Sequence, residues 1–85
     1  MDWDNLRYFL ELARAGTLVG AARRLGVDHT TVARRIQALE KQVGTPLFAR
    51  EAAGHRLSEA GRGLLPQVEG MEAAFLAVEH AAPGV

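Results

Sequence analysis

The sequence predicts a mainly α-helical domain in which three short helices, a two-stranded hairpin and one long helix follow one another. Three observations lead to this prediction. Apolar residues recur at spacings of three and four residues in four segments, glycines stand where the first three of these segments end, and two short strand-like stretches flank a turn that contains glycine. A chain of 85 residues has the size of a single domain.

The first two helices are expected over residues 4–15 and 18–25, because each range carries apolar or small residues along one helical face. A helix start favours side chains that accept hydrogen bonds from free backbone N–H groups, and a helix end favours glycine. The residues that meet these needs here are Asp2 or Asp4, Gly16, Thr17 and Gly26.

The third helix is expected over residues 29–43 with Asp28 as its cap, and it has two contrasting faces. Its core face spans about 60° around the helix axis and consists of Val32, Ile36, Leu39 and Val43. The opposite face is hydrogen-bonding and basic, with Thr30, Arg34, Gln37 and Lys41. Two short helices joined by a glycine-containing turn, the second with a polar outer face, are typical of a helix-turn-helix.

After the third helix, residues 47–50 and 55–58 have the character of two short strands around a turn at 51–54. A hairpin at this place would be the wing of a winged helix-turn-helix. Ser58 can cap a long final helix. The expected organisation is a winged helix-turn-helix over residues 1–58, a linker and dimerisation helix over 59–81, and a tail or the start of an inter-domain linker over 82–85.

The long helix carries an apolar seam with the alternating spacing of heptad repeats, and its members are Leu57, Gly61, Leu64, Val68, Met71, Phe75 and Val78. The seam can pack back onto its own domain or onto a second subunit. A helix of about 22 residues is about 33 Å long, longer than a three-helix domain can cover. We therefore expect a homodimer, with an interface made by Leu64, Val68, Met71, Phe75 and Val78.

Composition argues against several other classes of protein. The chain has no cysteine, so it offers neither a disulfide nor a thiolate zinc site, and its three histidines are scattered. No apolar run approaches the roughly 20 residues of a membrane span, and the N-terminus lacks a secretory signal. No paired carboxylates, glycine-rich loop or activated nucleophile indicates an enzyme. We expect a soluble intracellular protein without a metal or cofactor.

The net charge of zero hides a strong asymmetry along the chain. Residues 14–62 contain nine Arg or Lys and four acids, a net charge of +5, whereas residues 1–13 carry −2 and residues 63–85 carry −3. A basic middle between acidic ends is compatible with a surface that faces phosphate groups. A solvated charged surface without a ligand is the alternative, and the sequence pI of about 6.8 is low for a nucleic-acid-binding domain.

Several short stretches, in this order and at this spacing, resemble the N-terminal domain of LysR-type transcriptional regulators. They cover nearly the whole chain and comprise Leu6-Arg7-Tyr8-Phe9, Ala21-Ala22-Arg23-Arg24-Leu25, residues 32–36, Ala38-Leu39-Glu40, Gly44-Thr45-Pro46-Leu47-Phe48 with Arg50, and Leu57-Ser58-Glu59-Ala60-Gly61. The resemblance implies a bacterial, cytoplasmic regulator with a winged helix-turn-helix and a linker helix that pairs two subunits. In the family an effector-binding domain follows, so no small-molecule site is expected in this segment.

The chain departs from the family pattern at the start of the third helix. Family members often carry Ser-Gln-Pro where this chain has Asp28-His29-Thr30, a serine at position 33 and a glutamine at position 35. The wing tip is also poor in basic residues. These positions are where bases or phosphates would be contacted, so the departures concern the target sequence rather than the mode of binding.

In a helix-turn-helix the N-terminal residues of the second helix reach base edges in the major groove. Here these residues are His29, Thr30, Thr31 and Arg34. The planar fork of Arg34 can bond O6 and N7 of guanine together, although a contact to phosphate alone is the alternative. The alternative for His29 is that it simply occupies the first helical turn, and the alternative for either threonine is that it acts as a second cap.

Contacts to the DNA backbone are expected from basic side chains around this helix and from the start of the second helix, whose N–H groups and dipole favour a phosphate. The candidates are Thr17, Arg23, Arg24, Arg35, Arg50, His55 and Arg56, and for each the alternative is a solvated surface residue. The other function to weigh is a protein-interaction module with the same fold. Its outer helical face would need aromatic or aliphatic anchors, so we expect a homodimer that binds double-stranded DNA in a sequence-specific manner.

Overall fold

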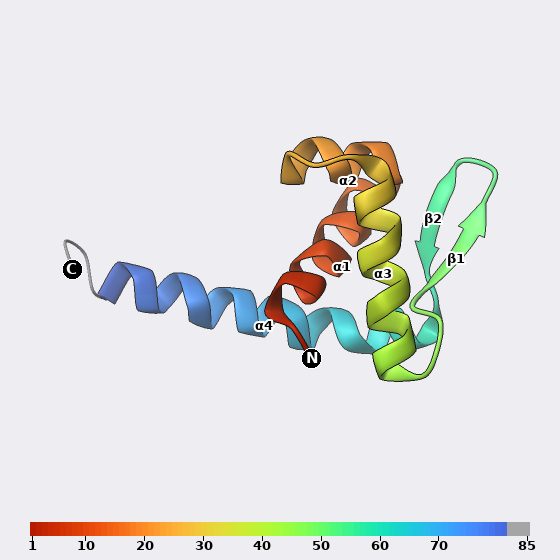
Figure 1. Cartoon of the computed structure of the whole chain (residues 1–85). Helices are drawn as coiled ribbons and strands as arrows, with labels where there is room; N and C mark the ends of the chain where they lie inside the picture. Colours follow the sequence, from red (N-terminus) through yellow and green to blue (C-terminus); the bar gives the residue numbers. More distant parts are fainter. Residues whose placement is uncertain (82–85) are drawn as a thin grey trace.

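The computed structural model describes residues 1–81 and contains four helices and one hairpin (Figure 1). The elements in chain order are α1 (Trp3–Ala15), α2 (Leu18–Leu25), α3 (His29–Val43), β1 (Phe48–Glu51), β2 (Gly54–Leu57) and α4 (Glu59–Ala81). The mainly α-helical, winged helix-turn-helix architecture is therefore confirmed. The predicted tail at residues 82–85 lies outside the described residues.

Side-chain caps explain where the first two helices begin. The carboxylate of Asp2 accepts a hydrogen bond from the backbone N–H of Asp4 at 3.0 Å, so α1 starts one residue earlier than expected. Thr17 caps α2 in the same way, with its hydroxyl oxygen 3.0 Å from the N–H of Gly20. Asp28 occupies the N-cap position of α3, but its side chain makes no cap hydrogen bond within the described chain, contrary to expectation.

The core lies between α1, α2, α3 and the first half of α4. Its largest fully buried side chains are Phe9, Leu10, Leu12, Val32, Leu39, Leu47 and Val68. On α3, Val32, Ile36 and Leu39 are buried as the periodicity predicts, but Val43 is 36% exposed. The prediction for Val43 is wrong because it is the last residue of α3, at the margin of the core.

The wing has the register that the sequence predicts, with Arg50 opposite His55, but a shorter turn. Strands β1 and β2 pair antiparallel, with Glu51 opposite Gly54, so the turn has two residues, Ala52 and Ala53, instead of four. The predicted strands at 47–50 and 55–58 are each displaced by one residue. The backbone of Gly54 has a φ of 146°, which a residue with a Cβ rarely adopts, and this allows the shorter turn to close.

Close backbone contacts seat the wing against the helices. The N–H of His55 donates to the carbonyl of Gly16 at 2.8 Å, and a Cβ built on Gly54 would lie 2.2 Å from the same oxygen. The base of the wing is held from the other side, since the N–H of Ser58 donates to the carbonyl of Leu47 at 2.9 Å. The wing is thereby fixed against the junction of α1 and α2 rather than free in solvent.

The start of α4 packs tightly on the base of the wing. The hydroxyl of Ser58 donates to the carbonyl of Pro46 at 2.7 Å and accepts from the N–H of Gly61 at 3.1 Å, so Ser58 caps α4 as expected. A Cβ built on Gly61 would lie 2.2 Å from the carbonyl oxygen of Leu47. Only glycine permits this approach of helix to loop.

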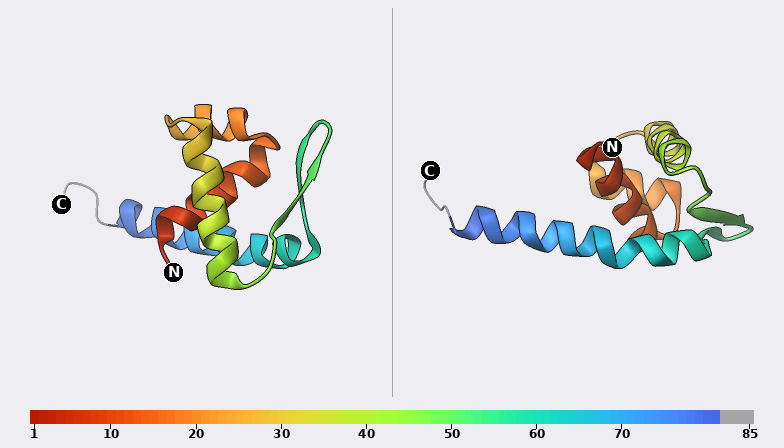
Figure 2. Two further views of the ribbon diagram at one scale, coloured as in Figure 1. Left: turned by 45° about the vertical axis from the view of Figure 1, so that its right-hand side comes forward. Right: turned by 90° about the horizontal axis from the view of Figure 1, so that it is seen from below.

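The two halves of α4 have different environments (Figure 2). In the first half, Val68 is fully buried and Leu64 is partly buried against the core. In the second half, Met71 is 46%, Phe75 48% and Val78 66% exposed. The prediction that Val68 contacts a second subunit is therefore wrong, because its own domain covers it.

Because its second half projects, the molecule is elongated. Its radius of gyration is 13.4 Å, against about 12 Å for a compact domain of this length.

An ion-pair network joins α4 to α1 and α2. The guanidinium of Arg14 donates to both carboxylate oxygens of Glu72, at 3.1 and 2.7 Å. The carboxylate of Glu11, 3.8 Å from Arg14, accepts from Nε of Arg24 at 2.8 Å. Further along α4, the ring centres of Phe75 and Trp3 are 6.3 Å apart. These contacts hold α4 against α1 at the point where it leaves the domain.

Two glycines of α4 provide a matched test of the close packing at its start. We expect Gly61→Ala to lower the free energy of unfolding by about 1–3 kcal/mol, because the methyl group would overlap the Leu47 carbonyl. Gly63 has nothing within 4 Å of a built Cβ, so Gly63→Ala should raise stability by about 0.5–1 kcal/mol. Urea denaturation followed by circular dichroism measures both changes. If both alanine variants were more stable than the wild type, the loop at Leu47 would have moved to accommodate the added methyl group, and the prediction for Gly61 would be wrong.

The ion pair between Arg14 and Glu72 predicts a dependence of stability on pH. The hydrogen bonds from Arg14 hold the pKa of the Glu72 carboxyl below its ordinary value. As pH falls below about 4.3, the Glu72 carboxyl takes up a proton in the unfolded chain before it does so in the folded chain. The stabilisation by the ion pair is therefore complete above that pH, and it is lost as pH falls further through the lowered pKa of the folded state. We expect stability to fall less steeply in this acid range for Glu72→Gln than for the wild type.

The matched control for this pH experiment is Glu79→Gln, which removes the same charge from an exposed position of α4. For this variant the free energy of unfolding should fall with decreasing pH as steeply as for the wild type, in denaturation curves recorded from neutral pH downward. Parallel curves for wild type and Glu72→Gln would contradict the stabilising role of the pair.

Candidate nucleic-acid interface

The outer face of α3 presents most of the residues that the sequence singles out for reading bases. His29, Thr30 and Arg34 are exposed, and Thr31 is partly buried. Nη2 of Arg34 lies 3.3 Å from the hydroxyl oxygen of Thr31, to which it donates. The guanidinium is thus oriented by a neighbour one helical turn earlier, and its remaining N–H groups are available to a ligand.

At the start of α3, the Asp28 carboxylate contacts the side chains of Thr30 and His29. The hydroxyl of Thr30 donates to the carboxylate of Asp28, and Nδ1 of His29 lies 3.5 Å from the other oxygen of that carboxylate. The hydrogen bond from Thr30 is the main reason why the pKa of Asp28 lies below its ordinary value. The Thr30 hydroxyl proton is therefore engaged, and its methyl group is what Thr30 offers to a ligand.

Arg35 lies on the flank of α3, as predicted, but the structure connects it to α1. Its Nη1 donates to the side-chain oxygen of Asn5 at 3.0 Å, and its guanidinium carbon lies 5.2 Å from the centre of the Tyr8 ring. Asn5 is a buried polar residue that the sequence analysis did not identify. Its position among apolar residues of α1 was the available signal, since a buried amide requires a partner.

The α2 residues that are expected to contact the DNA backbone differ in whether they already have a partner in the protein. Arg24 and Arg23 are both exposed, but Arg24 is paired with Glu11. Arg23 forms no ion pair within residues 1–81. Thr17 uses its hydroxyl oxygen to cap α2, so it can contribute a hydroxyl proton and the backbone N–H groups of the helix start.

The wing holds three basic residues in three different settings. Arg50 is exposed on β1, and Arg56 is exposed with its Nε 3.3 Å from the Glu51 carboxylate. The His55 ring is partly buried and packs edge-on against Phe48, with centroids 6.4 Å apart. Its Nδ1 is buried without a hydrogen-bond partner within the described chain. His55 therefore docks the wing on the domain rather than standing at its tip.

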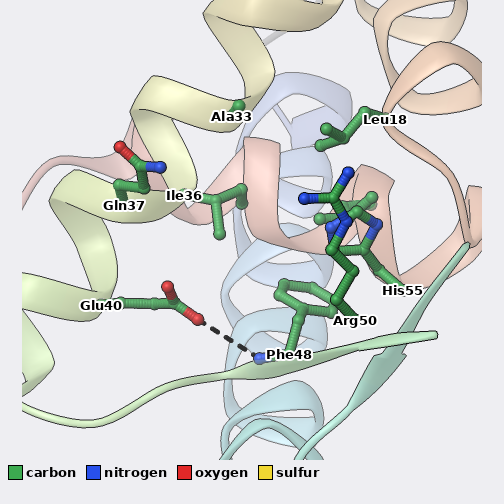
Figure 3. Close-up of a pocket in the computed structure, with 9 residues that line it drawn as sticks. Leu18, Ala33, Ile36, Gln37, Glu40, Phe48, Arg50 and His55 are labelled. Atoms are coloured by element: carbon green, nitrogen blue, oxygen red, sulfur yellow. Dashed lines mark hydrogen bonds between the residues drawn. The ribbon is translucent and has the colours of Figure 1, made fainter.

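Glu40 connects the inner side of α3 to the wing (Figure 3). Its carboxylate accepts from the N–H of Leu47 at 2.7 Å and from that of Phe48 at 3.3 Å. Between α3 and the wing lies a cavity of about 250 Å³, into whose far end Arg50 and His55 extend in Figure 3. Glu40 thus sets the separation between α3 and the wing.

A second groove, of about 330 Å³, lies where the starts of α2 and α3 meet the wing. It brings together Thr17 at the start of α2, His29 at the start of α3, and Arg50 and His55 from the two strands of the wing. Arg35, by contrast, is directed toward the N-terminal part of α1. Four of the predicted residues therefore line one groove, and Arg35 lies away from it.

Within residues 1–81, no group of three side chains could hold a metal ion, and no helix is long and apolar enough to cross a membrane.

Comparison with known proteins agrees with this geometry. A family model described as "Bacterial regulatory helix-turn-helix protein, lysR family" matches residues 3–62. The regulator TfdS of Cupriavidus pinatubonensis is 41% identical over 71 residues, which are 84% of this chain and 24% of that protein. The uncharacterised regulator YusT of Bacillus subtilis is 45% identical over 65 residues, 76% of this chain and 22% of that protein. The chain thus spans about a quarter of the length of these relatives.

Solved structures are similar over almost the whole chain. The DNA-binding domain of CbnR in complex with DNA is 33% identical, with a TM-score of 0.85 that covers 95% of this chain and 94% of that one. Full-length OxyR from Pseudomonas aeruginosa is 26% identical, with a TM-score of 0.87 over 95% of this chain and 28% of that one.

Proposed function

The chain belongs to the lysR family of bacterial regulatory helix-turn-helix proteins, and on this basis we propose that it binds specific sequences of double-stranded DNA as a homodimer to regulate transcription. The observation that carries the proposal is the polar and basic outer face of α3, on a fold that matches the DNA-bound domain of CbnR. The function is one of recognition, not catalysis.

In the proposed complex α3 enters the major groove, which is about 12 Å wide and admits one helix. Arg34, oriented by Thr31, reads guanine through a bidentate contact. His29 and the methyl group of Thr30 lie at the base-facing start of the helix. A contact of Arg34 to phosphate alone is the competing arrangement, and the two differ in what they predict for specificity.

Backbone contacts come from α2 and the wing. Thr17, at the start of α2, and Arg50 line the second groove, and Arg23 lines a neighbouring hollow that shares His29 with it. Arg56 adds charge on the outer side of β2 and would lie on the minor groove or its phosphates. Arg24 and Arg35 are already bound to Glu11 and Asn5, so we assign them weaker contacts with phosphate.

The homodimer is proposed to form through the second half of α4. Met71, Phe75 and Val78 share one side of the helix and are 46–66% exposed, so they form an apolar surface that a partner can cover. Trp3 of α1 lies beside Phe75 and extends the apolar surface onto the domain. A symmetric pair of such helices would present two copies of α3 to a roughly palindromic site.

The function can be tested by selecting binding sites from a random duplex pool at physiological salt. We expect an enriched motif with dyad symmetry, because two recognition helices would read equivalent half-sites. Arg34→Ala should weaken binding by about 1–3 kcal/mol and relax the preference for guanine at one position of each half-site. Arg23→Ala is the matched comparison, since loss of a phosphate contact weakens binding to all sequences alike.

A pool that stays random with the wild-type protein would overturn sequence-specific binding. An equal loss on every sequence for Arg34→Ala would leave DNA binding intact and remove Arg34 from the base-reading residues.

Charged substitutions on the apolar side of α4 test the homodimer. We expect the double variant Met71→Glu with Phe75→Glu to be monomeric in analytical ultracentrifugation and to bind DNA much more weakly, because the interface would have to bury two carboxylates. Ala73→Glu, on the opposite side of α4 by helical periodicity, should remain dimeric. A dimer that persists in the double variant would exclude this surface as the interface.

A further inference from the structure

Asp28 is the only acidic residue between Glu11 and Glu40 in the sequence, and it stands at the base-facing start of α3. Its side chain is 66% exposed, so burial does not explain its presence. The residues around it that are proposed to meet DNA are basic or neutral. A negative charge at this point requires a separate explanation.

The fold makes little use of this carboxylate. Aspartate at an N-cap normally accepts a hydrogen bond from a backbone N–H of the first helical turn, but the Asp28 side chain makes no such bond in the described structure. It accepts instead from the hydroxyl of Thr30. This contact places the carboxylate beside Thr30, which is one of the proposed base-reading residues.

A carboxylate near DNA repels phosphate groups and so lowers affinity for every sequence. Its possible benefit is selectivity, because an ionised carboxylate only accepts hydrogen bonds. In the major groove cytosine presents the N4 amino group as a donor, whereas guanine presents the acceptors O6 and N7 and thymine the acceptor O4. Adenine presents a donor at N6 beside the acceptor N7, so a carboxylate is partly repelled there. Aspartate therefore favours cytosine and disfavours guanine and thymine.

We propose that Asp28 is a specificity-determining residue that accepts a hydrogen bond from the N4 amino group of a cytosine in each half-site, with Thr30 holding the carboxylate in position. This inference rests on the proposed function. It adds an acceptor to the donor fork of Arg34, so that one short helix would read a cytosine and a guanine through opposite chemistry.

The test is site selection from a random duplex pool with the wild-type chain, Asp28→Ser and Asp28→Asn. Serine is a neutral residue that caps helices well, so Asp28→Ser remains informative if asparagine disturbs folding. We expect cytosine to be preferred at one position of each wild-type half-site. That preference should fall about tenfold in Asp28→Ser, and it should move toward adenine in Asp28→Asn, because asparagine pairs with adenine N6 and N7.

Glu51→Gln on the wing is the matched control, since it also removes one negative charge from the proposed DNA-facing side. It should raise affinity for all sequences alike and leave the motif unchanged. The same uniform gain in both Asp28 variants, with an unaltered motif, would show that Asp28 acts through charge alone and would overturn the inference.

A base other than cytosine at the position that responds to Asp28 would also overturn it. A wild-type pool that stays random would instead defeat the proposed function, and this inference with it. The two failures are therefore distinguishable.

Discussion

The hydrogen bonds around Leu47 hold α3, the wing and α4 together. The side chain of Leu47 is fully buried, its N–H donates to Glu40 of α3, and its carbonyl accepts from Ser58 at the end of the wing. The same carbonyl lies against Gly61, where only glycine fits. Because the backbone of this one residue contacts three elements, the distance from α3 to the wing and the direction of α4 are set at a single place.

The ion-pair network extends this connection to the other side of the domain. Arg14 holds Glu72 with two hydrogen bonds, and Glu11 joins Arg14 to Arg24 on α2. Exposed pairs of this kind contribute little stability singly, but a bidentate contact restricts orientation. The direction in which α4 leaves the domain is therefore determined both at its start and in its middle, and a partner on its far half would meet a rigidly placed surface.

Local signals in the sequence were sufficient for the helices and insufficient for contacts between distant residues. Caps and glycines predicted the bounds of α2, α3 and α4, because these signals act within a few residues. The wing turn was predicted two residues too long, since the contact of Gly54 with Gly16 that seats the hairpin lies across the fold. Periodicity placed Val68 on an apolar face without showing which partner covers it, and the links of Arg35 to Asn5 and of Asp28 to Thr30 have no periodic signature.

The division of α4 into a buried half and an exposed half has a consequence for thermodynamics. Val68 makes α4 part of the core, whereas Met71, Phe75 and Val78 form a surface that the described residues leave exposed. If a second copy covers that surface, folding and association share one continuous helix. The unfolding temperature then depends on how much protein is present, as it does whenever a partner binds only the folded form. The cellular abundance of such a regulator would set its folded fraction as well as the occupancy of its sites.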